Sequence, residues 1–130
     1  MSNSQIRGFK YRFYPTPEQI EHLSKVFGHS RFVYNRLLAE RKIARLTFSQ
    51  ACRRLTVLKT EHLWLKEVSS VPLQQTLRNQ QRAFVNLAQK RAKFPTFKKK
   101  NNKQSASFVR TAFTYRNGVL ALAKMGALQV

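Results

Sequence analysis

The sequence predicts an α+β fold, with a mainly helical lobe inserted between an N-terminal β-strand and a C-terminal β-hairpin. Three observations lead to this prediction. Aromatic and basic residues alternate in GFKYRFY with the period of two that is typical of a half-buried strand. The middle of the chain spaces its apolar residues at helical intervals. Near the C-terminus, two short apolar runs flank Arg-Asn-Gly, which is a signal for a hairpin turn.

The first predicted strand, residues 7–14, has one aromatic face and one basic face. The aromatic face would point to the core, and Pro15 would end the strand. Because a lone strand has no backbone partner, we expect it to pair with the C-terminal hairpin. The inner residues are Phe9, Tyr11 and Phe13, and the outer residues, which we assign to nucleic acid, are Lys10, Arg12 and Tyr14.

Two helices separated by a turn are predicted next. Thr16 is a good N-cap, Pro17 suits the first helical position, and Gly28 is placed as a C-cap. The second helix would run from about Ser30 to Leu46. The pattern therefore predicts a turn between two helices near Gly28.

Two more helical segments and a hairpin complete the chain. FSQACRRLTVLKTE has Ser49 as a candidate N-cap, and the short mixed segment HLWLKEVSS is typical of a turn anchored by Trp64. A long helix begins at Ser70, with Pro72 in its first turn. The predicted boundaries are 1–15 for the first strand, 16–93 for the helical lobe, 94–106 for a basic loop and 107–130 for the hairpin.

The charge balance predicts a polyanionic partner. The chain has 25 Lys and Arg residues against 5 acidic residues, none of them Asp, and a net charge of +20. Such an excess repels itself in a compact state, and binding a polyanion relieves the repulsion. We expect DNA or RNA; an anionic membrane surface is the rival, and a basic structural protein such as a ribosomal component is a third class.

The sequence gives no sign of a membrane protein or a secreted one. No apolar run approaches the ~20 residues that a spanning helix needs. The first ten residues also lack the apolar stretch of a signal peptide. We therefore expect a cytoplasmic protein in contact with nucleic acid, with no membrane partner.

Catalysis is not expected from these residues. Two-metal cleavage of a phosphodiester needs clustered carboxylates, and five scattered Glu residues do not provide a cluster. His22, His29 and His62 share no metal-ligand spacing, and Cys52 alone forms neither an internal disulfide nor a Cys-based zinc site. We therefore predict no enzymatic activity, no metal and no cofactor.

The strongest binding signal is the run KRAKFPTFKKKNNK, which interleaves basic residues with two phenylalanines. The basic side chains can neutralise phosphates, while Phe94 and Phe97 can pack in the core or stack on bases. We favour the core for both rings, because Pro95 between them indicates a fixed bend; for the lysines, an ordinary solvated loop is the alternative. The predicted phosphate contacts are Lys90, Arg91, Lys93, Lys98, Lys99, Lys100 and Lys103.

The helices supply two further groups of candidates. Residues at the start of the second helix stand where a recognition helix presents its reading side chains, so Asn35 could read an adenine edge. An ordinary polar helix face is an equal alternative. Basic residues on one stripe of the long helix would follow a phosphate backbone. The candidates are Arg31, Asn35 and Arg36 in the second helix, and Arg78 and Arg82 in the long helix.

Five blocks of sequence, in order, resemble the N-terminal part of the TnpB (OrfB) family of proteins encoded by insertion sequences. They are YRFYPTPEQ, FGHSRFVYN, LKTEHLWLKEVSSVPLQQTLRNQQRAFVN, FPTFKKKNNKQSASF and LALAKMGALQV, and the resemblance covers roughly residues 9–130. Two minor departures occur near the hairpin: Ala123 stands where the family usually has Pro, and no aromatic residue follows Gly126.

The resemblance implies a relationship to RNA-guided DNA endonucleases, and therefore a nucleoid-associated protein of a bacterium or archaeon. In that family the N-terminal part is a wedge-type β-barrel interrupted by a helical recognition lobe, often described as helix-turn-helix, and it holds a guide RNA and reads a motif beside the DNA target. The family's nuclease domain would lie beyond Val130, so we expect an incomplete wedge barrel and no nuclease in this chain. We therefore expect a nucleic-acid-binding fragment linked to transposition and DNA recombination, with DNA and structured guide-type RNA as partners. The alternative is an autonomous helix-turn-helix regulator that binds DNA as a dimer.

Overall fold

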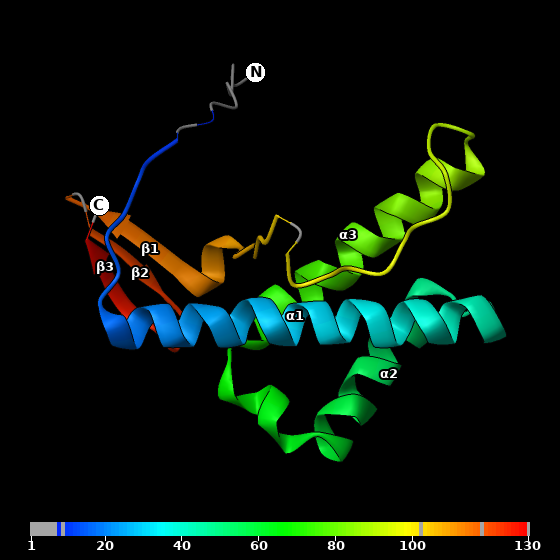
Figure 1. The fold of residues 1–130 in the computed structure, drawn as a ribbon, viewed down its shortest axis with the longest axis horizontal. Coiled ribbons are helices and arrows are strands. Elements are labelled where there is room, and N and C mark those ends of the chain that lie inside the picture. The colour runs from blue at the N-terminus through cyan, green and yellow to red at the C-terminus, as the bar shows by residue number, and fades with distance from the viewer. Residues whose placement is uncertain (1–7, 9, 102, 118, 130) are drawn as a thin grey trace, which may run out of the picture.

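Three helices and a small antiparallel sheet make up the part of the chain that the computed structural model describes (Figure 1). That part comprises residues 8, 10–101, 103–117 and 119–129, with the backbone alone for 127–129. The fold is therefore mainly helical with an α+β composition, as predicted. The elements are α1 (Pro17–Ala44), α2 (Phe48–Glu61), η1 (Leu63–Glu67), α3 (Ser70–Ala88), η2 (Arg110–Ala112), β1 (Phe113–Arg116), β2 (Val119–Leu122) and β3 (Gly126–Gln129).

The helix α1 is continuous over 28 residues, so the predicted turn near Gly28 is wrong. Its start is as predicted: the Gln19 amide donates to Thr16 Oγ1 at 3.2 Å, and the Thr16 amide donates to Gln19 Oε1 at 2.8 Å. The chain turns only after Ala44, where Arg45 takes a left-handed conformation with φ of 50°. Residues 45–47 then connect α1 to α2.

Packing explains why Gly28 does not end the helix. A glycine inside a helix costs about 1 kcal/mol relative to alanine. Apolar residues on both sides of it, Val26 and Val33, are almost completely buried against the other helices, at 1% and 0% exposed. Burying one such side chain contributes about 1.5–3 kcal/mol, which exceeds the local preference of glycine.

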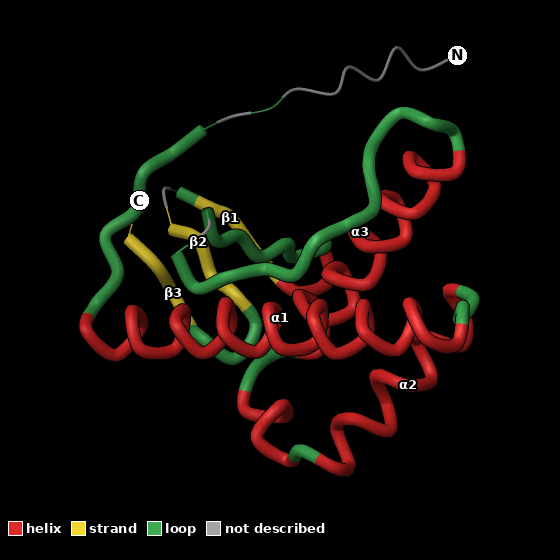
Figure 2. Tube along the Cα trace, turned by 45° about the vertical axis from the view of Figure 1, so that its right-hand side comes forward, coloured by secondary structure: helices red, strands yellow, loops and turns green. Residues whose placement is uncertain are grey.

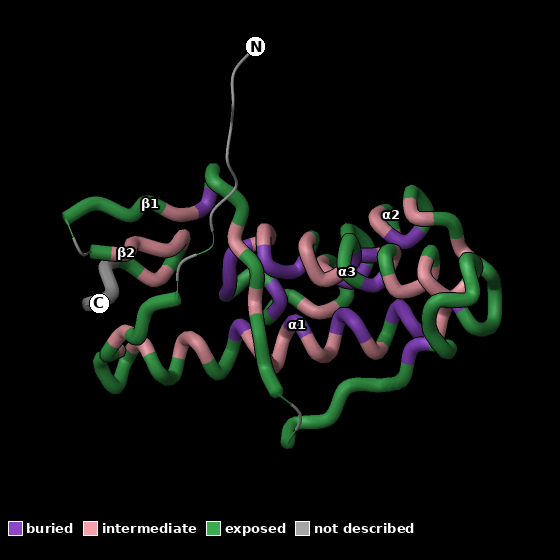
Figure 3. The backbone as a smooth tube through the Cα atoms, turned by 90° about the horizontal axis from the view of Figure 1, so that it is seen from above, coloured by how far each residue is buried: buried purple, intermediate pink, exposed green. Residues whose placement is uncertain are grey.

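The core lies where α1, α2 and α3 meet (Figure 3). Leu37 from α1, Leu58 from α2 and Leu77 from α3 are each fully buried. The N-cap of α2 is Thr47, which forms a capping box with Gln50, so the prediction of Ser49 was wrong by two residues. α1 and α2 therefore both begin with a capping box, in which the threonine hydroxyl accepts a hydrogen bond from the backbone amide three residues later.

Of the two segments after α2, the long helix begins where it was predicted, whereas the predicted turn is a short helix. The mixed segment after α2 is the short helix η1, where Trp64 packs edge-on against Phe32 at 4.9 Å and against His29 at 4.7 Å. The long helix α3 begins at Ser70, with Ser69 as its N-cap. None of the described helices is long and apolar enough to cross a membrane.

A buried polar contact joins α1 to α3. Arg41 is only 7% exposed, and its guanidinium donates to Gln80 Oε1 at 3.4 Å and to Gln81 Oε1. It also lies 4.4 Å from the centre of the Phe84 ring. Gln80 in turn donates to the Tyr34 carbonyl oxygen at 2.9 Å. Burial lowers the pKa of Arg41, because its charge is held by neutral dipoles and a ring rather than by water.

The C-terminal sheet confirms the hairpin and adds a strand that was not predicted. Its order is β1-β2-β3 and all pairs are antiparallel, with Arg116 opposite Val119 and Leu122 opposite Gly126. The Lys124 ammonium donates to the Lys66 carbonyl oxygen at 2.8 Å, which ties the turn between β2 and β3 to η1. The described strands form one open sheet. The incomplete wedge barrel that the resemblance implies stays a prediction.

The predicted N-terminal strand is wrong for the residues described. Residues 10–13 are not in a strand, and only Tyr14 makes an isolated bridge; Phe9 lies outside the described residues. Alternation indicates which side chains share a face, but a strand also needs a neighbouring backbone to pair with. One contact with the hairpin is between rings, since Tyr11 stacks on Tyr115 with centroids 5.7 Å apart.

Candidate nucleic-acid interface

The connection from α3 to η2, residues 89–109, contains the predicted basic loop of residues 94–106, and we call this whole connection the basic loop. It returns from the end of α3 across the side of α1 to the sheet (Figures 1 and 2). Its described residues are exposed almost throughout (Figure 3). Pro95 is buried. Because the basic side chains of the loop repel one another, contacts with the rest of the protein are needed to hold the loop in one conformation. These contacts are made by residues of α1 and α3.

Asn35 is the central anchor. Its side-chain Nδ2 donates to the Lys98 carbonyl oxygen at 2.9 Å, and the Lys98 amide donates to Asn35 Oδ1 at 2.7 Å. The Lys98 ammonium also lies 4.6 Å from the centre of the Tyr34 ring. Reading an adenine edge would need the same two amide atoms of Asn35, so the structure gives this residue an anchoring role while the loop is in place.

Phe94 and Phe97 of the loop are exposed, so the prediction that both rings lie in the core is wrong. Phe94 meets Phe84 edge-on at 5.5 Å, and the Lys42 ammonium lies 5.2 Å from the Phe94 ring and 4.6 Å from the Phe97 ring. Phe94 and Phe97 nevertheless remain 41% and 44% exposed. The rings therefore fasten the loop to the ends of α1 and α3 and still present aromatic surface to solvent.

Cationic residues from α1 and the loop converge around one pocket between α1, α3 and the loop. Its volume of about 40 Å³ is enough for a water molecule and far too small for a nucleobase. The pocket can therefore admit oxygen atoms of a phosphate lying over it, with the cations around its rim. The polar and charged residues of its lining are Ser30, Arg31, Thr76, Asn79, Lys98, Lys99, Lys103, Gln104, Ser105 and Ser107.

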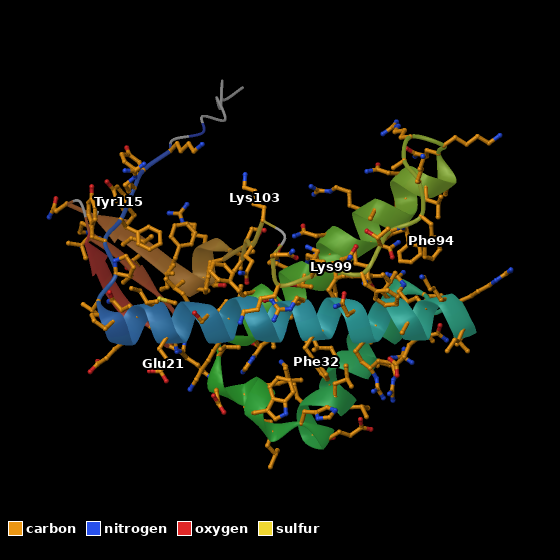
Figure 4. All side chains as sticks on the ribbon, viewed as in Figure 1. Glu21, Phe32, Phe94, Lys99, Lys103 and Tyr115 are labelled. Atoms are coloured by element: carbon orange, nitrogen blue, oxygen red, sulfur yellow. The ribbon has the colours of Figure 1, made fainter. Side chains whose placement is uncertain are left out.

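The glutamates lie apart from this group of cations. Glu40 accepts hydrogen bonds from Arg54 of α2, the shortest at 2.7 Å, and Glu67 of η1 pairs with Lys25 at 3.1 Å. In Figure 4, Glu21 points to the opposite side of α1 from Lys99 and Lys103. We call the surface formed by Arg31, Lys98, Lys99 and Lys103 the basic face; it meets no carboxylate among the interactions found in the described residues.

The remaining predicted binding residues are dispersed around the basic face. Arg78 and Arg82 are exposed on α3, and Arg78 lies 6.0 Å from the Phe48 ring. Arg36 belongs to another group, since its Nε is 3.9 Å from Glu40. The other candidates are all exposed: Lys90, Arg91, Lys93 and Lys100 in the loop, and Lys10, Arg12 and Tyr14 before α1.

Some residues at the interface were not predicted from sequence. Thr76 and Asn79 of α3 line the pocket, and their spacing of three places them on one helix face. Arg110 and Arg116 lie beside Tyr115 at the sheet. The helical spacing of Thr76 and Asn79 could have predicted that they share a face of α3. The proximity of Arg110 and Arg116 to Tyr115 in one groove could be found only from the folded chain.

The described residues hold no group of three or more His, Cys, Asp or Glu side chains placed to bind a metal ion. The ammonium and guanidinium groups of the basic face can bind anions.

Several known proteins are similar to this chain. A family model described as a helix-turn-helix domain of the OrfB type matches residues 1–46. A "Putative RNA-guided DNA endonuclease" from Streptomyces pristinaespiralis is 51% identical over 91% of this chain and 32% of its own length. The corresponding protein InsQ from Escherichia coli is 33% identical over 88% of this chain and 29% of its own length. "Virulence protein VsdF" from Salmonella dublin is 39% identical over 75% of this chain and 97% of its own length.

The chain belongs to the TnpB (OrfB) family. It spans about a third of the length of the first two relatives. Among the described residues of the segment matched by the helix-turn-helix model, the helix is α1, which ends at Ala44. In this TnpB-family chain α2 begins at Phe48, after the matched segment.

Proposed function

We propose that this TnpB-family chain binds nucleic acid through the basic face and the adjoining loop. The observation that carries the proposal is the Asn35 anchor, which holds Lys98 in place beside Lys99, Lys103 and Arg31, away from the glutamates. Ammonium and guanidinium groups held on one surface attract phosphates and release the counterions that screen them.

The finer proposal is that the bound nucleic acids are DNA and a structured, guide-type RNA. Two relatives are named as RNA-guided DNA endonucleases, and together they cover nearly the whole of this chain. We further propose that residues 1–130 bind without cleaving, because their five acidic residues include no Asp and form no metal-binding cluster in the described part.

The test is a salt titration of binding to duplex DNA and to a structured RNA, followed by fluorescence anisotropy. Each phosphate contact on duplex DNA adds about 0.9 to the slope of log K against log salt concentration. We expect the double variant Lys99→Ala/Lys103→Ala to lower this slope by about 2 and to weaken binding at every sequence tested.

A matched control removes the same charge elsewhere. Arg53 of α2 and Lys66 of η1 are exposed residues of the elements that pack on the other side of α1 (Figure 1). Arg53→Ala/Lys66→Ala should change the slope by much less than the first pair. Equal effects of the two pairs would mean that net charge, and not the basic face, drives binding; absence of any salt-dependent binding would refute the function itself.

A further inference from the structure

Two tyrosine rings stack on each other at the surface, where the N-terminal segment meets the sheet. The centroids of Tyr11 and Tyr115 are 5.7 Å apart, with an angle of 26° between the rings. Both remain largely in solvent, since Tyr11 is 59% and Tyr115 is 47% exposed. A stack of two rings that serves only the core would be covered, as Tyr34 is at 7% exposed.

Each ring borders a shallow groove that carries basic side chains. One groove is lined by Arg110, Phe113, Thr114, Tyr115 and Arg116. The other is lined by Lys10, Tyr11, Arg12 and Phe13. Both grooves are open and much larger than the small pocket of the basic face. A flat ring of nucleobase size therefore has access to the aromatic surface.

The position of this tyrosine pair links it to the basic face. In Figure 4, Tyr115 lies on the same side of α1 as Lys103 and Lys99. A strand bound along the basic face can thus extend to the sheet without crossing α1. The two regions differ in chemistry, because the pocket of the basic face is lined mainly by charged and polar side chains, whereas the sheet end has basic side chains beside two stacked, exposed tyrosine rings.

We propose that the Tyr11–Tyr115 pair binds an unpaired nucleobase by stacking, with Arg110 and Arg116 on the flanking phosphates. Stacking on aromatic side chains needs a free π-face, which a base within a duplex does not offer. The proposal rests on the proposed function and deepens it: the chain distinguishes nucleic acid with unpaired bases from a continuous duplex. Single-stranded DNA and single-stranded RNA share the required chemistry.

The test compares binding of the full chain to four probes by fluorescence anisotropy. They are a blunt duplex, an unstructured single strand of DNA of about 12 nucleotides, the same strand in RNA, and the same DNA strand with abasic sugars throughout. The variants are Tyr115→Leu, which removes the ring and keeps an apolar side chain, and Tyr115→Phe, which keeps the ring. Tyr11→Leu serves as a second ring deletion, and circular dichroism checks that each variant is folded.

We expect Tyr115→Leu to weaken single-strand binding on the order of tenfold while leaving duplex and abasic binding unchanged. Tyr115→Phe should bind like the parent chain. The salt slope should stay the same, since stacking releases no counterions. A loss on the DNA strand alone, or on the RNA strand alone, would assign the site to that one sugar.

Two outcomes separate this inference from the proposed function. If the parent chain binds all probes with a salt-dependent affinity and neither ring deletion changes single-strand binding, the stacking site is refuted and the basic face stands. If Tyr115→Leu weakens duplex, abasic and single strands alike, the ring acts only through the fold, and the inference fails. If the parent chain binds none of the probes, the proposed function fails first.

Discussion

Replacing Asn35 should release the basic loop from α1. The Asn35 amide forms two hydrogen bonds with the Lys98 backbone, at 2.9 and 2.7 Å, across 63 residues of sequence. A hydrogen bond of this kind contributes about 0.5–1.5 kcal/mol net, and partial exposure places these two toward the lower end. The pair therefore stabilises the closed loop by about 1–2 kcal/mol.

The assay is hydrogen exchange at the Lys98 amide in the Asn35→Ala variant. An opening free energy lower by about 1–2 kcal/mol corresponds to exchange that is roughly 5- to 30-fold faster. Affinity for a polyanion should fall as well, because binding must then order the loop again. Asn79→Ala is the matched control, since it removes another asparagine at the same pocket and leaves the two anchor bonds intact.

Unchanged exchange at Lys98 in Asn35→Ala would refute the anchoring argument. If the variant instead keeps normal exchange and loses a preference for adenine at one position of bound DNA, Asn35 reads a base, as its place in the sequence first indicated. The two roles thus give opposite results in two independent measurements.

Three further predictions concern stability. Gly28→Ala should stabilise the chain by about 0.5–1 kcal/mol in urea unfolding, because a Cβ at Gly28 meets only a side-chain nitrogen of Arg31 at 3.8 Å; destabilisation would mean that the helix breaks there. Gln80→Ala should destabilise by about 2 kcal/mol or more, since it opens a cavity and takes an acceptor from a buried guanidinium, while Gln74→Ala on the exposed side of α3 should change stability by less than about 0.5 kcal/mol. Burial lowers the pKa of His29 below 6.5, despite the opposing effect of nearby Glu67. As the pH falls, His29 is therefore protonated in the unfolded chain before it is protonated in the folded chain. Stability should therefore fall as the pH drops below 6.5, and His29→Gln should flatten that fall in urea midpoints measured against pH.

Local signals in the sequence were sufficient to predict where most helices begin. Thr16 and Ser70 stand at or next to their helix starts, because a cap depends on a few neighbouring residues. Gly28 misled the prediction, since the burial of Val33 and its neighbours by other helices outweighs the preference of a single glycine. β3 was missed because its four residues become a strand only by pairing with β2.

The candidate site was predictable in composition and not in arrangement. The lysines of the loop were evident from the charge run, and they are exposed as expected. The contact between Asn35 and Lys98 joins residues that share no local pattern, so only the folded chain reveals it. The same holds for Tyr11 and Tyr115, which were assigned to a strand face and to a hairpin.

The continuity of α1 also limits how the length of this chain can vary. With 28 residues the helix is about 42 Å long; the sheet lies beside its first half, and its second half packs against α3 (Figures 1 and 2). Inserting one residue into α1 before Asn35 would rotate the rest of the helix by about 100° and shift it by about 1.5 Å relative to the part beside the sheet. Asn35 would then no longer face the Lys98 backbone. Insertions at residues 45–47 or 89–93 would be absorbed by the connections there. Insertions and deletions among related chains should therefore occur in those connections and not within α1.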